Sequence, residues 1–385
     1  MEYFLTEHQK MVKQLARRIA EEKILPVRAE LDEKEEFPWE IMKELANVDM
    51  FRLFIPQEYE GLGGGVLELC LVMEELSRVC SGISVGYAAS ALGSFLIIDF
   101  GSAEQKQKYL PVLASGHKLA AFALTESTAG SDAAGIKTTA TRDGNEYILS
   151  GTKQFITNGG EAEIYTIIAL TDLAKGPRGA SAFIVEKGTP GFSFGKKEKK
   201  LGIRASATRE LVFHNCRIPK DNLLSREGMG FIMVMKVVDK TRPGVGAQAV
   251  GVAQGALEAA VAYAQERVQF GHPISSFQAV QHMLANMATE IEAARCLVYT
   301  VAKTIDSGAK DFTEEAAMAK IFASDVAMRV TVDALQIFGG VGYMRDFPIE
   351  KMMRDAKITQ IYEGTNQVLR NVVALELLRR RALRQ

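Results

Sequence analysis

The hydrophobic pattern divides the chain into three zones, and the first, residues 1–120, has helical spacing. Its clearest run is residues 8–24, with apolar positions at Met11, Val12, Leu15, Ile19 and Ile24. Two further helices are predicted over residues 66–80 and 83–100. The later one has no charged residue before Asp99, which indicates a helix buried on all sides.

Short apolar runs of β character fill the second zone, residues 121–230. The predicted strands are 147–149, 164–170, 182–185 and 210–213. Turn residues separate them, as in Asn158-Gly159-Gly160. Such spacing predicts a small antiparallel β-barrel or sandwich.

Alanine-rich helical stretches dominate the third zone, residues 231–385. The longest are 246–268, 278–306 and 314–338, and they predict a packed antiparallel bundle. We therefore expect an α+β protein of three domains: 1–120 helical, 121–230 a β-barrel, and 231–385 a helical bundle. This order contains no βαβ repetition, which argues against a doubly wound sheet.

Composition narrows the function. The 385 residues carry a net charge of −1, so no overall field favours nucleic acid or an anionic membrane. The four cysteines are scattered without a C-x-x-C pair, which favours reduced thiols in the cytoplasm. The histidines form no zinc-ligand spacing, so we expect no metal site. The first ten residues lack the apolar core of a signal peptide, and no run of 18 apolar residues predicts a membrane span.

A glycine-rich segment, residues 61–65, resembles a dinucleotide-binding loop but does not complete one. Val66 stands where the third motif glycine belongs, and the residues before Gly61 form a poor strand. We interpret it as a flexible turn.

One carboxylate near the C-terminus, Glu363, has an unusual setting. It follows Ile361 and Tyr362, precedes Gly364, and stands just before a predicted helix. A carboxyl group buried among apolar groups has a raised pKa and can act as a base near neutral pH. The alternative is a solvated residue in the turn before a helix capped by Thr365 or Asn366.

Two polar segments in the middle zone can serve a ligand. Residues 123–132 gather hydroxyl groups and a glycine at a strand exit, which can bind a pyrophosphate or the edge of a heterocycle. An ordinary polar turn is the alternative. Further on, Phe155 and Thr157 share one face of a strand and can contact a flat ring. The alternative for Phe155 is a place in the barrel core.

Four markers now stand in order: 123–132, 266–271 with Phe277 and Gln278, 336–358, and 361–365. Together they resemble the acyl-CoA dehydrogenase family over essentially the full chain. The resemblance implies a helical N-terminal domain, a middle antiparallel β-barrel and a C-terminal four-helix bundle. It implies FAD held without a Rossmann fold, dehydrogenation of an acyl-CoA thioester at its α,β bond, electron-transferring flavoprotein as the acceptor, and a homotetramer.

The resemblance also implies site residues. FAD would contact Phe122, Leu124, Thr125, Gly130, Ser131, Phe155, Ile156, Thr157, Thr365, Asn366 and Gln367. A neighbouring subunit would add Arg267, Phe270, Gln278, Gln336, Gly339 and Gly340. The substrate would meet Ser131, Asp239, Arg242, Glu363 and Gly364. Glu363 would be the catalytic base, because the position used instead by some family members holds Thr241 here.

The acyl group is less constrained by the sequence. Residues 83–98 contain no Arg or Lys, which speaks against a substrate with a distal carboxylate. Five small residues leave room for a short or medium chain or a compact ring: Ala88, Ala89, Ser90, Ala91 and Gly93. Tyr87 and Phe95 either close the pocket or pack the helix.

Three alternative functions share this fold. They are an acyl-CoA oxidase, a subunit of an enoyl-CoA reductase complex, and a flavin-bearing nucleic-acid-binding relative. The last would depend on the basic end formed by Arg379, Arg380, Arg381 and Arg384.

Overall fold

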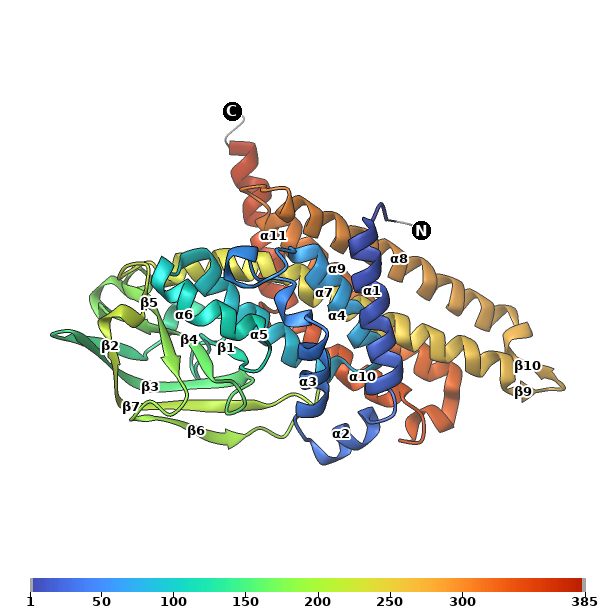
Figure 1. Ribbon diagram of the computed structural model, residues 1–385. Helices are drawn as coiled ribbons and strands as arrows, with labels where there is room; N and C mark the ends of the chain where they lie inside the picture. Colours follow the sequence, from blue (N-terminus) through green and yellow to red (C-terminus); the bar gives the residue numbers. More distant parts are fainter. Residues whose placement is uncertain (1–2, 383–385) are drawn as a thin grey trace.

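The computed structural model describes residues 3–382 and has the three expected parts (Figure 1). The helices are α1 (Glu7–Ile19), α2 (Arg28–Lys34), α3 (Trp39–Asn47), α4 (Val66–Val79), α5 (Ser81–Phe100), α6 (Ala103–Ala114), α7 (Gly230–Glu266), α8 (Gln278–Asp306), α9 (Thr313–Phe338), α10 (Ile349–Lys357) and α11 (Asn366–Ala382). The strands are β1 (Ala120–Ala123), β2 (Thr139–Asp143), β3 (Glu146–Thr157), β4 (Ile164–Leu170), β5 (Ala180–Glu186), β6 (Phe192–Lys197), β7 (Thr208–Pro219), β8 (Leu223–Leu224), β9 (Val268–Gln269) and β10 (His272–Pro273).

Helix α5 is the apolar helix expected over residues 83–100. By length and composition it is the one described helix that could cross a membrane, but 72% of its most apolar window is buried inside the protein. It packs directly on β1, where Ser90 Oγ accepts a hydrogen bond from the Ala120 N–H at 3.1 Å. Gly93 permits this approach, since a Cβ there would lie 2.8 Å from the Ala120 Cβ. The burial therefore reflects packing within the core.

The middle domain is one large sheet in the order β6-β7-β3-β2-β4-β5-β8, with β1 also paired to β4. Its pairings are antiparallel except for β1 with β4 and β2 with β4. The expected barrel is not closed, because β6 and β8 remain at opposite edges. Strand β8 has only two residues before the chain turns into α7, so no ladder reaches β6.

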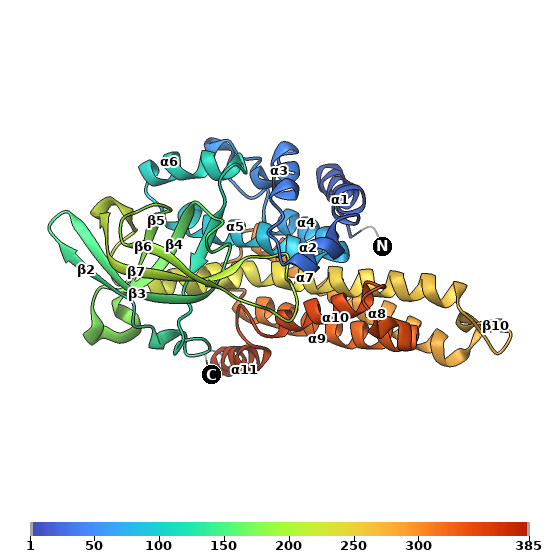
Figure 2. The same cartoon turned by 90° about the horizontal axis from the view of Figure 1, so that it is seen from below.

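The C-terminal bundle is built on α7, which runs from the sheet domain to the hairpin of β9 and β10 at the far end (Figure 2). The helix starts at Gly230, well before the predicted start at residue 246. Pro243 lies inside it, and a proline removes one backbone donor without always ending a helix. The predicted helices 278–306 and 314–338 correspond to α8 and α9.

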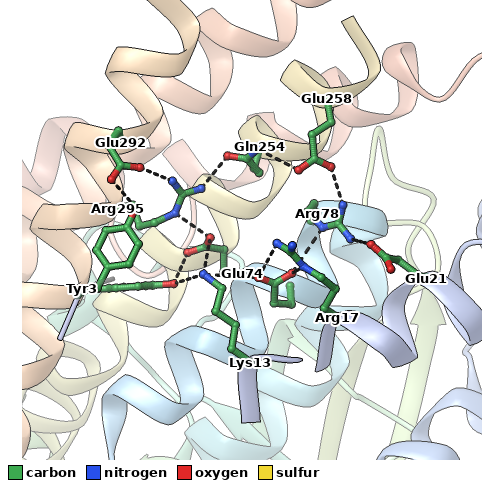
Figure 3. Close-up of polar contacts among 12 residues, drawn as sticks. Tyr3, Lys13, Arg17, Glu21, Glu74, Arg78, Gln254, Glu258, Glu292 and Arg295 are labelled. Carbon is green, nitrogen blue, oxygen red and sulfur yellow. Dashed lines mark hydrogen bonds and ion pairs between the residues drawn. The ribbon is translucent and has the colours of Figure 1, made fainter. Parts of the chain in front are cut away.

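A network of charged side chains joins α1, α4, α7 and α8 (Figure 3). The buried Glu74 accepts hydrogen bonds from Arg295 Nε at 2.8 Å and from Tyr299 OH at 2.7 Å. The buried Glu75 accepts one from Arg17 Nε at 2.9 Å. Since each buried carboxylate has a cationic partner, the network fixes the N-terminal helices on the bundle.

Candidate active site

A cavity of about 430 Å³ lies where the three domains meet. Helices α4, α5 and α7, the segment after β1, strand β3 and the turn before α11 contribute to its wall. The predicted site residues that it brings together are Phe122, Leu124, Thr125, Gly130, Ser131, Phe155, Ile156, Thr157, Arg242, Glu363 and Gly364.

Glu363 stands in a tight turn on the wall of this cavity. The φ of Glu363 is 50° and that of Gly364 is 95°, so two successive residues have a left-handed backbone conformation. Glycine adopts such a conformation readily because it has no Cβ. Thr241 Oγ1 donates a hydrogen bond to Glu363 Oε2 at 2.8 Å, and Arg242 Nε donates to the Glu363 carbonyl oxygen at 3.4 Å. The turn and its two partners on α7 direct the carboxylate.

Burial raises the pKa of the Glu363 carboxyl above its ordinary value. The bond from Thr241 and the charges of Arg242 and Lys320 act in the opposite direction but do not cancel the effect. A carboxylate with this balance is a suitable base near neutral pH.

Lys320 of α9 is a member of the site that the sequence analysis missed. Its side chain is fully buried, and Nζ donates to the Gly364 carbonyl at 2.7 Å and to Asn366 Oδ1 at 3.0 Å. Burial lowers the pKa of Lys320 to about 7. The available signal was a single lysine within the apolar, alanine-rich run 316–323.

The residues after Glu363 mainly shape the start of α11. Thr365 Oγ1 accepts a hydrogen bond from the Val368 N–H at 3.2 Å, so it caps the helix. Asn366 is buried and bonds Ser324 Oγ at 2.9 Å, whereas Gln367 is exposed. None of the three lines the cavity.

Asp239 also lies outside the cavity wall. It forms an ion pair with Arg242 and accepts a hydrogen bond from Thr313 Oγ1 at 2.6 Å. Asp239 thus holds Arg242 along α7, and Thr313 of α9 in turn holds Asp239.

A buried ion pair supports the segment after β1, and sequence analysis did not identify it. Glu126 accepts hydrogen bonds from Lys153 Nζ at 2.8 Å and from the Thr138 N–H at 3.0 Å. Lys153 also donates to the Leu124 carbonyl oxygen at 2.9 Å. Burial lowers the pKa of Lys153 to about 8. The pair fixes β3 against the segment whose hydroxyl groups line the cavity.

Phe155 does not belong to the core of the sheet. Its φ is 59°, its side chain is 58% exposed, and it lies at a register shift between β3 and β7. Such a bulge next to a cavity re-aims a side chain. The strained backbone and the exposed ring fit a flat ligand that covers them. At Gly130 a Cβ would meet nothing within 4 Å, so the cavity wall is open at this position.

The predicted FAD contacts assigned to a neighbouring subunit do not line the cavity: they lie at the hairpin of β9 and β10, at the start of α8 and around the C-terminal end of α9, and Figure 2 shows this hairpin at the end of α7 far from the sheet domain. All are exposed: Arg267, Phe270, Gln278, Gln336, Gly339 and Gly340. About 25 residues of α7 separate Arg242 from Arg267, which corresponds to roughly 37 Å of helix. Within one chain these residues therefore form a second surface.

Comparison with known proteins identifies the chain. Three family models match it in order: acyl-CoA dehydrogenase N-terminal domain over 6–117, middle domain over 121–216 and C-terminal domain over 228–378. The chain belongs to the acyl-CoA dehydrogenase family. Its fold class is confirmed, and the protein is a flavin-dependent oxidoreductase with FAD as its cofactor.

Individual relatives cover almost the entire acyl-CoA dehydrogenase chain. The acryloyl-CoA reductase (NADH) of Anaerotignum propionicum is 49% identical over 99% of this chain and 97% of the relative. Butyryl-CoA dehydrogenase from Megasphaera elsdenii superposes with a TM-score of 0.96 at 46% identity, covering 98% of this chain and all of the relative. A third match is a chain in a structure of the electron transferring flavoprotein of Acidaminococcus fermentans, which addresses flavin-based electron bifurcation. It superposes with a TM-score of 0.96 at 51% identity, covering 98% of this chain and all of that chain.

The possibilities of a metal site and of a nucleic-acid site can be compared with residues 3–382 of the structure. Those residues contain no group of His, Cys, Asp or Glu side chains that could hold a metal ion. At the basic end, Arg379 pairs with Asp311 at 3.0 Å and Arg380 with Glu314 at 3.0 Å. Acidic neighbours thus balance two of the cations that a nucleic-acid site would need, and Arg384 lies outside the described residues.

Proposed function

We propose that this acyl-CoA dehydrogenase removes the α-proton of a saturated acyl-CoA with Glu363, giving the 2-enoyl-CoA. The observation that supports this assignment is a carboxylate of raised pKa on the wall of a largely apolar cavity. FAD, when bound, supplies the acceptor for the β-hydride. Thr241 holds one carboxylate oxygen, which leaves the other to accept the proton. The Glu363 backbone N–H is assigned to the thioester oxygen, where it stabilises developing negative charge.

The cavity wall supports a short or medium linear acyl group, or a compact ring. Leu69, Met73, Val85, Ala88, Ala89 and Leu92 give it an apolar end. Among the described residues that line the cavity, Arg242 is the only Arg or Lys, and it is already paired with Asp239. The described part of the cavity wall therefore offers no free cation for a substrate with a distal carboxylate.

Part of the sequence-based argument about substrate size needs correction. Ser90, Ala91 and Gly93 do not line the cavity, and two of them serve the contact of α5 with β1. Tyr87 and Phe95 are packing residues, since both are buried away from the cavity and Tyr87 OH donates to the Met50 carbonyl at 2.9 Å. Residues of α4 and α5 that face the cavity therefore limit the acyl chain.

An anaerobic titration of the holoenzyme with acyl-CoAs of increasing length tests this function. We expect bleaching of the flavin absorbance by short and medium chains. Glu363→Gln should retain FAD but show no bleaching. If no saturated acyl-CoA bleaches the flavin, the proposed dehydrogenation is wrong, and if Glu363→Gln bleaches fully, the base assignment is wrong.

Electron-transferring flavoprotein is the proposed electron acceptor. A second candidate function is the reverse reaction, in which the same flavoprotein supplies electrons for reduction of an enoyl-CoA. One relative is named acryloyl-CoA reductase (NADH). Another similar chain comes from the structure of an electron transferring flavoprotein that addresses flavin-based electron bifurcation. The second candidate is therefore the flavoprotein subunit of an enoyl-CoA reductase complex. NADH-dependent reduction of a short enoyl-CoA after addition of an electron-transferring flavoprotein would favour it; no reduction with that partner would exclude it.

We also propose a cytoplasmic homotetramer in which each FAD is shared between subunits. The length of α7 between the cavity and the exposed Arg267 supports sharing. An apolar groove of α8, α9 and α11, with Met318, Phe322 and Leu377 on its wall, offers an area for subunit contact. All four cysteines are free, as expected in a reducing compartment. Dilution to monomers should release FAD, and a monomer that keeps FAD would contradict the sharing.

A further inference from the structure

Lys320 is a buried lysine with no role in the proton transfer described so far, and with a pKa lowered to about 7 it is a cation on the acidic side of neutral pH. It projects from α9 and reaches the turn that carries Glu363, because its Nζ bonds the Gly364 carbonyl at 2.7 Å. The same Nζ donates a hydrogen bond to Oδ1 of Asn366, the first residue of α11, at 3.0 Å. The lysine thus holds both ends of the short segment between Glu363 and α11.

The charged groups around Lys320 leave Glu363 as the acid whose charge it balances. Arg242 faces the same region but is paired with Asp239. Asp325 of α9 is already engaged by Arg370 Nη2 at 2.7 Å and by Gln360 Nε2 at 2.6 Å. Glu363 has only the neutral Thr241 hydroxyl on its carboxylate among the hydrogen bonds of residues 3–382.

We propose that Lys320 is a positioning residue for proton abstraction: it anchors the Glu363 turn through the Gly364 carbonyl, and its charge favours the ionised carboxylate. This role rests on the proposed function of Glu363. A cation near a carboxylate lowers the pKa of that carboxyl, so Lys320 opposes the effect of burial on the base, together with the Thr241 hydroxyl and Arg242. It does not touch the substrate.

Exchange of the α-protons of acetyl-CoA in D2O, followed by proton NMR on the holoenzyme, isolates this step. Acetyl-CoA has no β-carbon, so it can lose an α-proton but cannot be dehydrogenated. The exchange breaks the α C–H bond, leaves its electron pair on the enolate, and moves the proton to Glu363, from which solvent deuterium returns. The pH dependence of the rate reports the ionisation of the base.

We expect Lys320→Met to move the acidic limb of this profile upward by about one pH unit. Lys320→Gln keeps a donor near the Gly364 carbonyl but loses the charge, so it should show a similar shift and decides the matter if Lys320→Met does not fold. Ser324→Ala is the matched control, because it loosens Asn366 without removing charge and should leave the limb in place.

Two results would overturn the proposal, and they differ. If both Lys320 variants keep the wild-type limb, even with a lower melting temperature, then Lys320 only stabilises the fold. If Glu363→Gln exchanges at the wild-type rate, then Glu363 is not the base and both proposals are wrong. An unshifted limb together with an inactive Glu363→Gln would leave the proposed function intact.

Discussion

The base and its hydroxyl partner are separated by 122 positions in the chain, yet one hydrogen bond of 2.8 Å joins them. The sequence predicted Glu363 as the base and treated Thr241 only as the absence of a competing carboxylate. The structure gives that threonine a direct contact with the carboxylate. Residue types in a motif can indicate the chemistry, but contacts with Thr241 and Lys320 depend on how three separate segments meet, which no local spacing specifies.

Removing the threonine hydroxyl should weaken the base most at low pH. The bond from Thr241 favours the charged form of Glu363, so Thr241→Ala raises the pKa of the carboxyl further. For a pKa raised by about one unit we expect kcat/KM to fall about tenfold at pH 6, and less at pH 8, where a larger fraction of the carboxyl is ionised. Thr241→Ser retains the hydroxyl and should keep the wild-type pH profile. Equal losses at both pH values would contradict this explanation.

At the scale of elements, regular periodicity was sufficient for the long helices and for β4, which spans the predicted residues 164–170. It was insufficient where elements meet closely. The early start of α7 was hidden by Pro243, and the open edge of the sheet depends on β8 ending after two residues. The bulge that exposes Phe155 likewise results from pairing between β3 and β7 rather than from its own segment.

The contact of α5 with β1 should be sensitive to a single methyl group. Gly93→Ala would place a Cβ 2.8 Å from the Ala120 Cβ, so the helix and strand must separate. We expect a loss of about 1–3 kcal/mol of stability, visible as a lower melting temperature of the apoprotein. Gly130→Ala is the control, because its Cβ meets nothing within 4 Å. Equal melting temperatures for both variants would show that α5 can shift without cost.

The ion pair that joins β3 to the segment after β1 should affect both stability and cofactor retention. Lys153→Met leaves the Glu126 carboxylate buried without its cation, which costs about 3–5 kcal/mol. We expect a lower melting temperature and weaker FAD binding, measured by ultrafiltration. Adding Glu126→Gln removes the unpaired charge and should restore part of the stability. No recovery in the double variant would mean that the hydrogen bond to Leu124, rather than the charge, dominates.

At the scale of the whole molecule, the two sets of predicted FAD contacts are separated along α7: one surrounds the cavity beside residues 231–248, and Arg267 of the other follows the C-terminal end of the helix. Sequence markers could predict both sets but not their separation, since their distance depends on one uninterrupted helix. If neighbouring subunits share each FAD, two different inactive subunits should complement one another.

Mixed assemblies provide that test. Glu363→Gln lacks the base at the cavity, and Arg267→Ala lacks a cation at the exposed tip. After dissociation and joint reassembly in equal amounts, random pairing should give complete sites at about a quarter of positions. We therefore expect about a quarter of wild-type activity from two inactive preparations. If mixing restores no activity, Arg267 does not act on a neighbour's site.

The length of α7 therefore limits which insertions and deletions the chain can accept. Each residue of an α-helix contributes 1.5 Å of rise and about 100° of rotation. A one-residue deletion between Ala249 and Glu266, beyond the last residue of α7 that lines the cavity, would leave the local cavity intact but turn Arg267 away by more than a quarter of a circle. Substitutions along this helix can be absorbed locally, whereas insertions and deletions would change the geometry between active sites. The helix therefore fixes the distance and orientation between the cavity and Arg267. We expect its number of residues to vary far less than its amino-acid composition.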